Sequence, residues 1–431
     1  MAGLTIGFAG LSHLGIVSGC AAAEKGFRVV GYDDDAAVVD ALARGTLPVV
    51  EPDLPEMFLR NRDRLSFTSE PSGLADCDLV YIARDVPTDD HGISDVSAIT
   101  DLIDRVQPHI RENAVIVILC QVPPGFTRKL SDTDPRFYYQ VETLIFGRAV
   151  ERALRPERLI IGAADASAEL PKSFSTVLSA FDCPVLTMRL ESAELAKISI
   201  NMCLVASIGV ANTMAGVCEV VGADWSEIVP ALRLDARIGP SAYLKPGLGL
   251  AGGNLERDLA TVINLADAHD RDHGIVDAWI ANSAIRKDWA YETLSALILD
   301  SNPAARIAVL GLAYKENTHS VKNSASLRLL SRLSGCDTVV YDPIVDPTEV
   351  VPDCAAAKSA MEAVAGADVV VLITPWPEFS ALDPHAVADI MRGRVMIDPY
   401  ALIDRTEAVA AGFVYSTLGC ETVAPKENRN A

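Results

Sequence analysis

Near the start of the chain lies the stretch Gly7-Phe-Ala-Gly10-Leu-Ser12-His-Leu-Gly15. It follows a strand-like segment, Thr5–Phe8, and precedes an Ala-rich helical pattern that runs to about Lys25. Its spacing matches the dinucleotide fingerprint GxGxxG, whose glycines allow a tight turn, a close approach to a pyrophosphate and close helix–strand packing. The middle glycine is replaced by Ser12, which we expect to crowd the phosphates or to add a hydroxyl contact. The stretch predicts a turn that holds a pyrophosphate on a helix N-terminus.

A carboxylate follows the second strand-like run, Phe27–Tyr32. Asp33 stands there, 23 residues after Gly10. In such folds a carboxylate at this place holds the ribose 2′-OH and disfavours the 2′-phosphate of NADP. The sequence therefore predicts NAD as the cofactor, with Asp33 as one of its ligands.

The same alternation of strand and helix patterns continues and then starts again late in the chain. A long helical stretch covers about 192–221, a Gly/Pro-rich loop covers 237–253, and Ser301–Pro303 is interpreted as a linker. We therefore expect an α/β protein with two Rossmann-like, doubly wound parallel-sheet domains joined by a central, mainly helical domain. The predicted boundaries are 1–190, 191–300 and 301–431. The strands expected beyond the first two are 79–83, 114–119, 306–310, 339–341, 369–373 and 395–397.

Composition excludes several classes of protein. The 431 residues are 50% hydrophobic and 22% charged, which excludes a disordered or collagen-like chain. The net charge of −21 argues against a nucleic-acid partner, because such proteins need basic surface. The nine cysteines show no metal-ligand or disulfide spacing, so we expect no metal site. We see neither an export signal nor an apolar run of roughly 18 residues, and we expect a reduced, cytoplasmic protein without a membrane partner.

The ordered motifs resemble the UDP-glucose/GDP-mannose dehydrogenase family from about residue 4 to residue 419. This resemblance implies an NAD domain, a central helix that forms a homodimer, and a C-terminal nucleotide-sugar domain. It also implies oxidation of a sugar CH2OH to a carboxylate in two hydride transfers. The motifs, besides the opening turn, are Gln121-Val-Pro-Pro-Gly-Phe-Thr127, Glu142-Thr-Leu-Ile-Phe-Gly147, Ala193-Glu-Leu-Ala-Lys197 with Asn201, Pro246-Gly-Leu-Gly-Leu-Ala-Gly-Gly253, Gly311-Leu-Ala-Tyr-Lys315-Glu-Asn-Thr318, Tyr341-Asp-Pro343 and Thr374-Pro-Trp376.

The resemblance assigns roles to matching positions. Lys197, Asn201 and Asp258 match the residues around the reacting hydroxyl, where a cation stabilises an oxyanion and a carboxylate takes a proton. Lys197 and Asn201 are four residues apart and share a helix face. The further catalytic candidates are Glu142 and Asn254. The expected cofactor contacts are Gly7, Gly10, Ser12, His13, Leu14, Gly15, Asp33 and Thr127. The expected substrate contacts are Arg237, Tyr243, Lys245, Gly252 and Lys315.

Asn254 occupies the place of the family's catalytic cysteine, which lies in a loop of pattern GGxCxxKD. A thiolate adds to the aldehyde before the second hydride leaves, whereas a neutral carboxamide has no comparable nucleophile. Gln121 replaces a hydroxyl residue thought to position the hydrolytic water. The substrate-facing motifs also differ, at Arg257, His319-Ser320, Lys322 and Cys420, and neutral drift and an altered base or sugar both explain these changes.

Three hypotheses follow. The first is an NAD-dependent enzyme limited to a two-electron alcohol oxidation of a nucleotide sugar or nucleoside, which becomes a redox-neutral dehydration or epimerisation if the hydride is returned. The second is a conventional four-electron dehydrogenase that makes a uronate with water or another nucleophile. The third is a non-catalytic regulatory protein that holds the cofactor. The retention of Lys197, Asn201 and Asp258 speaks against the third.

Overall fold

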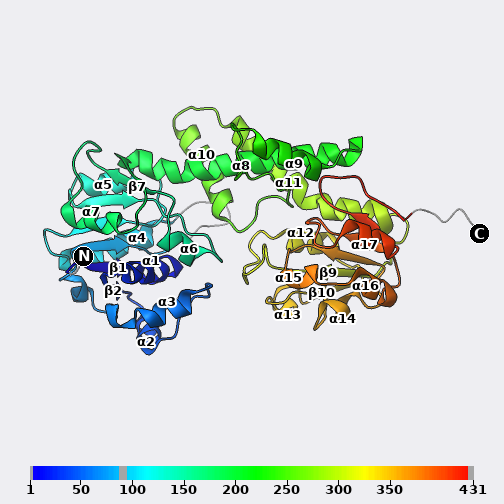
Figure 1. Cartoon of the computed structure of the whole chain (residues 1–431), viewed down its shortest axis with the longest axis horizontal. Coiled ribbons are helices and arrows are strands. Elements are labelled where there is room, and N and C mark those ends of the chain that lie inside the picture. The colour runs from blue at the N-terminus through cyan, green and yellow to red at the C-terminus, as the bar shows by residue number, and fades with distance from the viewer. Residues whose placement is uncertain (1–2, 87–94, 426–431) are drawn as a thin grey trace, which may run out of the picture. The chain divides into compact units, whose positions relative to one another are not determined.

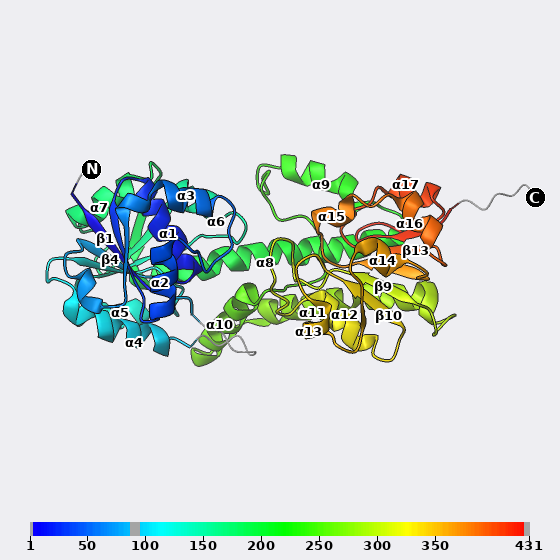
Figure 2. The ribbon, with the colours of Figure 1, turned by 90° about the horizontal axis from the view of Figure 1, so that it is seen from below.

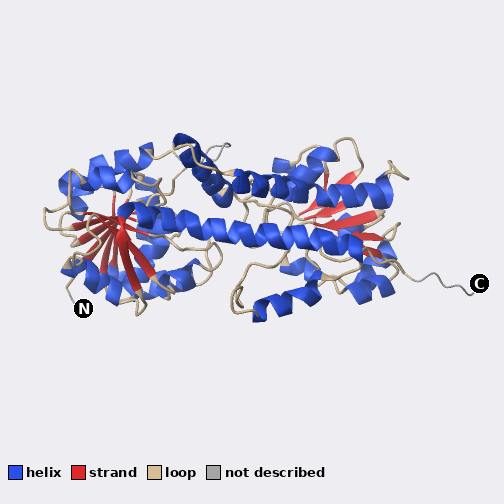
Figure 3. Cartoon of the chain, turned by 90° about the horizontal axis from the view of Figure 1, so that it is seen from above, coloured by secondary structure: helices blue, strands red, loops and turns tan. Residues whose placement is uncertain are grey.

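A computed structural model describes residues 3–86 and 95–425 of the chain. It divides into two compact units, residues 1–200 and 201–431. In Figure 1 the first unit runs from blue to green and the second from green to red. Each unit contains a twisted sheet, drawn in red in Figure 3, with helices around it.

The sheet of the first unit has the strand order β3-β2-β1-β4-β5-β6-β7-β8 within the described residues. Its first six strands are parallel, and the chain reverses its winding between β1 and β4. Such a switch point opens a crevice at the carboxyl ends of the strands, where ligands bind. The strands are β1 Thr5–Ala9, β2 Arg28–Tyr32, β3 Leu65–Thr68, β4 Leu79–Ile82, β5 Val115–Ile118, β6 Phe137–Gln140, β7 Leu159–Ala163 and β8 Val185–Arg189.

The core of this unit lies between the sheet and its helices. β1 and β4 are buried almost completely, and Phe8 of β1 stacks on Tyr81 of β4 with ring centroids 5.0 Å apart. In α1 the small residues Gly15 and Gly19 let the helix approach the sheet closely. The helices are α1 His13–Glu24, α2 Ala36–Arg44, α3 Leu54–Arg60, α4 Ser97–Val106, α5 Phe126–Ser131, α6 Ala149–Leu154 and α7 Lys172–Ser179.

The second unit repeats the strand order of a doubly wound sheet, β11-β10-β9-β12-β13-β14, with all pairs parallel. Its strands are β9 Ile307–Leu310, β10 Thr338–Tyr341, β11 Ala355–Ala356, β12 Val369–Leu372, β13 Val395–Ile397 and β14 Val414–Ser416. Its helices are α9 Trp225–Leu234, α10 Asn254–Ala268, α11 Gly274–Leu294, a π-helical turn Ser295–Leu299, α12 Ala325–Arg332, α13 Pro347–Val350, α14 Ala360–Val364, α15 Pro377–Ser380, α16 Pro384–Ile390 and α17 Arg405–Ala410.

Helix α8, Leu190–Val221, begins in the first unit and ends in the second (Figure 2). By length and composition alone it is apolar enough to cross a membrane, and 28% of its most apolar window is buried. The expectation that no apolar segment has this length is therefore wrong. Isolated Ser, Asn and Thr residues interrupt the apolar sequence of α8, but its mean hydropathy stays high enough for a membrane-spanning helix.

The predicted fold class is confirmed, and one detail of the first sheet differs. β7 pairs with β6 in the antiparallel sense, and β8 follows β7 in parallel, so the last two strands run against the other six. Helix α6 is too short to carry the chain back across the sheet. The β6–β7 connection therefore stays at the carboxyl edge of the sheet, where β6 ends, and β7 starts from that edge and runs in the opposite direction.

Candidate active site

The dinucleotide turn is so tight that only glycine fits at two of its positions. Gly10 has a φ of 96°, and a Cβ there would lie 2.7 Å from the backbone nitrogen of Arg84. A Cβ at Gly15 would lie 1.9 Å from the carbonyl oxygen of Gly10. These approaches close the first turn of α1 onto β1. The helix N-terminus then presents backbone N–H groups to an anion.

The other predicted residues of the turn take different places. Ser12 donates its hydroxyl to the carbonyl oxygen of Ala83 at 3.1 Å, which ties the turn to the end of β4. The side chain of Leu14 is buried in the core, so only its backbone belongs to the turn. Gly7 lies inside β1, where a Cβ would be 2.8 Å from Leu74. The structure therefore gives Gly7 a packing role, and its contact with the cofactor stays a prediction.

Asp33 lies beside the turn with one carboxylate oxygen turned towards it. Its Oδ2 accepts the backbone N–H of Leu11 at 2.7 Å, and its Oδ1 accepts that of Asp35 at 3.0 Å. A carboxylate has about four acceptor positions, so Asp33 retains capacity for a ribose hydroxyl. The glycine turn, the helix N-terminus and this carboxylate together fit the pyrophosphate and ribose of a dinucleotide such as NAD.

A buried carboxylate absent from the sequence predictions joins the turn to the loop after β6. Glu51 is 4% exposed and accepts the backbone N–H groups of Gly147 at 3.1 Å and Ala149 at 2.7 Å. The same carboxylate lies 3.0 Å from Nε2 of His13. The His13 ring packs at a tilt against the ring of Phe146, with centroids 4.2 Å apart. Glu51 therefore fixes this loop against the first residue of α1.

Helix α8 holds the loop after β5 through a second buried carboxylate, Glu194. Glu194 accepts the backbone N–H of Gly125 at 2.6 Å and that of Thr127 at 2.8 Å. Burial raises the pKa of Glu194, while these hydrogen bonds oppose the increase. Thr127, a predicted cofactor contact, is itself fully buried. Glu194 thus positions the start of α5 at the carboxyl edge of the sheet.

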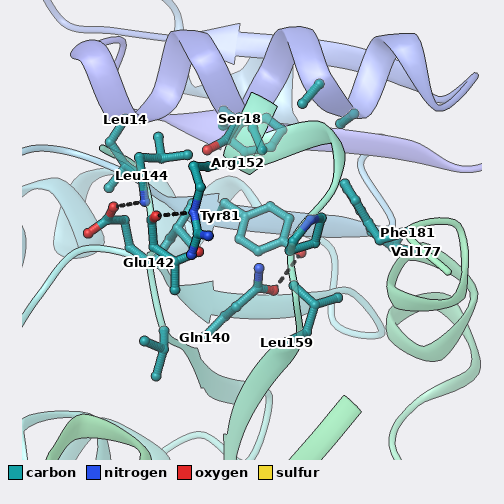
Figure 4. Close-up of a pocket in the computed structure, with 18 residues that line it drawn as sticks. Leu14, Ser18, Tyr81, Gln140, Glu142, Leu144, Arg152, Leu159, Val177 and Phe181 are labelled. Carbon is teal, nitrogen blue, oxygen red and sulfur yellow. Dashed lines mark hydrogen bonds between the residues drawn. The ribbon is translucent and has the colours of Figure 1, made fainter. Parts of the chain in front are cut away.

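Two predicted catalytic residues of the first unit form an ion pair. Nζ of Lys197 lies 3.3 Å from Oε2 of Glu142, and their side chains are only 15% and 19% exposed. The other oxygen of Glu142 accepts the backbone N–H of Leu144 (Figure 4). Because an ammonium group has three donors, Lys197 retains the capacity to hydrogen-bond an oxygen of a substrate.

In the second unit Asn201 and Asp258 are joined directly. Nδ2 of Asn201 donates to Oδ2 of Asp258 at 2.5 Å, and Nε of Arg257 lies 3.1 Å from Oδ1. Asp258 is fully buried, and Arg257 is 8% exposed. A buried carboxylate needs such charge compensation and hydrogen bonding to remain in the interior. Arg257 therefore supplies a compensating positive charge for Asp258 within the protein.

Asn254 is the first residue of α10 and is exposed. The loop before it needs glycine, since φ is 86° at Gly252 and 92° at Gly253. A Cβ at Gly252 would lie 2.7 Å from the Tyr314 ring, and its backbone N–H donates to the carbonyl oxygen of Lys322 at 3.0 Å. The loop therefore presents Asn254 at a helix N-terminus, where backbone N–H groups favour a negative charge.

The remaining predicted substrate contacts are spread over the second unit. Arg237 is 89% exposed and pairs with its neighbour Asp235 at 2.6 Å. Tyr243 is half exposed. Lys245 lies 5.7 Å from the ring centroid of Tyr400, and Lys315 lies 5.7 Å from that of Tyr314. The structure gives these side chains protein partners or solvent, and their roles towards a substrate stay predictions.

A cavity in the first unit lies between α1, α6, α7 and the sheet (Figure 4). Apolar side chains such as Leu14, Leu159 and Phe181 line it, and the hydroxyl of Tyr81 donates to Oε1 of Gln140 at 3.1 Å. Its volume of about 70 Å³ is far below the roughly 300 Å³ of a small-molecule site. The cavity, which Glu142 helps to line, is therefore too small for a nucleotide.

No cluster of three or more His, Cys, Asp or Glu side chains able to hold a metal ion occurs within residues 3–86 and 95–425. All nine cysteines are free thiols, and none lies in the loop that carries Asn254. Burial raises the pKa of Cys20 and of Cys120 to about 12, so these two thiols are unreactive at neutral pH.

A doubly wound sheet with this turn and with Asp33 defines an NAD-binding protein of the Rossmann type. Three domain profiles of a single family cover most of the chain: an NAD binding domain over residues 4–181, a central domain over 191–283 and a UDP binding domain over 308–405. The chain belongs to the UDP-glucose/GDP-mannose dehydrogenase family.

Relatives and solved structures agree with this assignment. The chain is 30% identical to the UDP-glucose 6-dehydrogenase TuaD of Bacillus subtilis, over 97% of this chain and 94% of the relative. It is 30% identical to the UDP-glucose 6-dehydrogenase AglM of Haloferax volcanii, over 93% and 97%. A UDP-glucose dehydrogenase from Pyrobaculum islandicum superposes with a TM-score of 0.84 at 25% identity, over 97% of this chain and 98% of that one.

Proposed function

We propose that this protein oxidises an alcohol carbon of a nucleotide sugar or nucleoside by removing two electrons, not four. The substrate loses a hydride from carbon and a proton from oxygen, and the products are a carbonyl compound, NADH and a proton. NAD, when bound, accepts the hydride. The observation that carries the proposal is Asn254, a carboxamide at the N-terminus of α10, in the position that the sequence resemblance assigns to the family's catalytic cysteine.

Lys197 and Asn201 support the alcohol step from successive turns of α8. Lys197, held by Glu142, stabilises the negative charge that develops on the substrate oxygen as the hydride leaves. Asp258 is fully buried, and both of its oxygens accept hydrogen bonds. We therefore infer that Asp258 positions Asn201, and its part in taking the substrate proton is the role that the family resemblance implies.

The second oxidation requires a tetrahedral adduct on the aldehyde carbon, because a carbonyl carbon bound to one hydrogen gives up a hydride only after a nucleophile has added. Asn254 offers no lone pair of sufficient basicity for this addition. Without the adduct the carbonyl product is either released or kept. If it is kept, the acidified neighbouring C–H permits epimerisation or loss of a leaving group, and return of the hydride makes the net reaction redox-neutral.

A conventional four-electron dehydrogenase is the second candidate. Its support is the similarity of this chain to UDP-glucose 6-dehydrogenases over nearly their whole length. In that case water adds to the aldehyde as a gem-diol, and Asn254 orients it as a hydrogen-bond donor or acceptor. The substrate-facing differences at Arg257 and Lys322 then reflect a change of base or sugar.

One experiment separates the candidates. The purified protein and NAD are incubated with a panel of nucleotide sugars and nucleosides, while NADH absorbance and product mass are followed. One NADH per substrate with loss of two hydrogens supports the two-electron reaction. Loss of water, or a new isomer of unchanged mass that chromatography separates from the substrate, supports a redox-neutral outcome when no net NADH forms. Two NADH per substrate with a carboxylate product overturns the proposal. A chain that turns over nothing in the panel favours a regulatory role.

We also propose that the protein acts as a cytoplasmic homodimer formed through α8. The helix exposes Val210, Met214, Val217 and Val221, whose spacing of four, three and four residues makes one apolar stripe. A second copy of the same stripe would cover it in an isologous contact. Light scattering of the wild-type chain should give twice the chain mass, and Val217→Glu should give the single mass. A wild-type monomer, or a V217E dimer, contradicts the proposal.

A further inference from the structure

The ribose end of the dinucleotide site carries two arginines that face one carboxylate. Arg84 follows β4, and its Nη2 hydrogen-bonds Oδ1 of Asp34 and lies 3.5 Å from Oδ1 of Asp33. Arg105 near the end of α4 reaches Oδ2 of Asp34 at 2.7 Å. Asp34 thus holds one guanidinium group on each of its oxygens, directly beside the carboxylate that selects NAD.

Arg84 is also joined to the pyrophosphate turn through its backbone. Its nitrogen and Cα lie where a side chain on Gly10 would be, at 2.7 and 2.9 Å from an ideal Cβ. Its side chain is 24% exposed, so the guanidinium stands at the surface of the site and is not locked in the core. The base of the side chain is therefore fixed at the turn, while its tip can exchange partners.

The second sheet of the protein provides an internal comparison. There Gly311 and Leu312 form the turn after β9, and Asp342 follows β10 as Asp33 follows β2. Oδ2 of Asp342 accepts the N–H of Leu312 at 2.6 Å, as Asp33 accepts that of Leu11. A Cβ at Gly311 would meet Thr374, which therefore occupies the place of Arg84.

Asp342 and Asp33 differ in how many acceptor positions of the carboxylate remain for a ligand. Asp342 also accepts the N–H groups of Ala313, Ile344 and Val345 and the indole N–H of Trp376 at 3.1 Å. Its acceptor capacity is used within the fold. Asp33 accepts two backbone N–H groups, and its neighbour on the β4 side is a cation. The carboxylate beside the turn of the second sheet therefore has its acceptor positions filled by the protein. The carboxylate beside the turn of the first sheet keeps free acceptor positions and lies next to arginine side chains.

We propose that Arg84 and Arg105 form a latent binding site for a 2′-phosphate, which Asp34 keeps closed by pairing with both guanidinium groups. Arginine matches phosphate by charge and by the fork of its N–H groups, and an arginine near the ribose accommodates the 2′-phosphate of NADP in related folds. Selectivity for NAD in this chain then depends on Asp34, which occupies the arginines, as well as on Asp33, which binds the hydroxyl. This inference rests on the NAD site alone and is independent of the proposed reaction.

The test measures binding of NADH and NADPH to the full-length chain by the fluorescence of the reduced nicotinamide, which requires no substrate. The wild-type chain should bind NADH and bind NADPH more weakly. Asp33→Ser with Asp34→Ser should bind NADPH about 10-fold or more tightly than the wild type does, since each released guanidinium adds charge-assisted hydrogen bonds. Adding Arg84→Ala or Arg105→Ala to this variant should remove most of the gain.

Asp33→Ser with Asp35→Ser is the matched control. It removes the same charge, Asp34 still occupies both arginines, and serine preserves the cap that Asp35 provides for α2. The control should gain little NADPH affinity. An equal gain in the control, no gain in the D33S/D34S variant, or a gain that survives the loss of both arginines overturns the proposal. If the double variant does not fold, Asp34→Asn alone should give a smaller gain in NADPH affinity and Asp35→Asn none, and equal affinities in this pair overturn it.

Discussion

Nζ of Lys197 on α8 lies 3.3 Å from Oε2 of Glu142, a residue of the loop after β6. The loop itself is tied back through Glu51 to the first residue of α1. The ammonium group, the loop and the dinucleotide turn are therefore parts of one hydrogen-bonded network in the first unit. Because its position is already fixed, this ammonium group needs little rearrangement to stabilise an oxyanion that forms beside it.

Lys197→Met should lower kcat by about 10²–10³-fold on the substrate that the panel identifies, because it removes the group that stabilises the developing oxyanion. Glu142→Gln should have a smaller effect, since the lysine remains and only its orientation is relaxed. NADH binding should be unchanged in both variants, as measured by fluorescence titration. Lys129→Met, at an exposed position of α5, is the control. Full activity of the K197M variant would show that the ammonium group is not catalytic.

Asn254→Cys should restore the second oxidation. A thiol at the N-terminus of α10 is placed where the helix favours the thiolate, and a thiolate can add to the aldehyde carbon. The variant should release two NADH per substrate and give a carboxylate product, whereas the wild type gives at most one NADH. Product mass and NADH yield check this. Asn254→Ser, which lacks a thiolate, should retain the wild-type stoichiometry.

Glu51→Gln should loosen the network that the sequence did not reveal. The carboxylate accepts two backbone N–H groups and lies against His13 while buried, and hydrogen bonds to a charged acceptor contribute about 1.5–3 kcal/mol each. We expect a lower urea midpoint and weaker NADH binding. Glu56→Gln, exposed on α3, is the matched control and should change neither. If E51Q bound NADH as tightly as the wild type does, the loop that Glu51 holds after β6 would not contribute to cofactor binding.

The contrast between Gly10 and Glu51 explains how far the sequence alone can lead. The turn at Gly10 and the carboxylate of Asp33 were predictable, because a local spacing between strand and helix defines both. The partners of Glu51 lie 96 and 98 residues away, and those of Glu194 lie 67 and 69 residues away. Nothing in their neighbours signals such contacts. The reversal at β7 was missed for the same reason, since strand direction depends on how the chain returns.

Asp288 of α11 should make the stability of the second unit depend on acid pH. It accepts Nε of Arg328 at 2.8 Å and lies 3.1 Å from Nη1 of Arg332, which ties α11 to α12. The hydrogen bond from Arg328, aided by Arg332, lowers its pKa to about 2. This is below the unfolded value of about 3.9, so the carboxylate contributes stability at neutral pH that is lost as the pH falls from about 4 to about 2.

Asp288→Asn should therefore lower the free energy of unfolding by about 1 kcal/mol at neutral pH, the magnitude of a partly exposed ion-pair network. The difference from the wild type should shrink below about pH 3, where the wild-type carboxylate is itself becoming protonated. Urea unfolding followed by tryptophan fluorescence at both pH values measures it, because Trp289 and the other tryptophans all lie in the second unit. A difference that stays the same at both pH values would assign the loss to packing and not to the charge of Asp288.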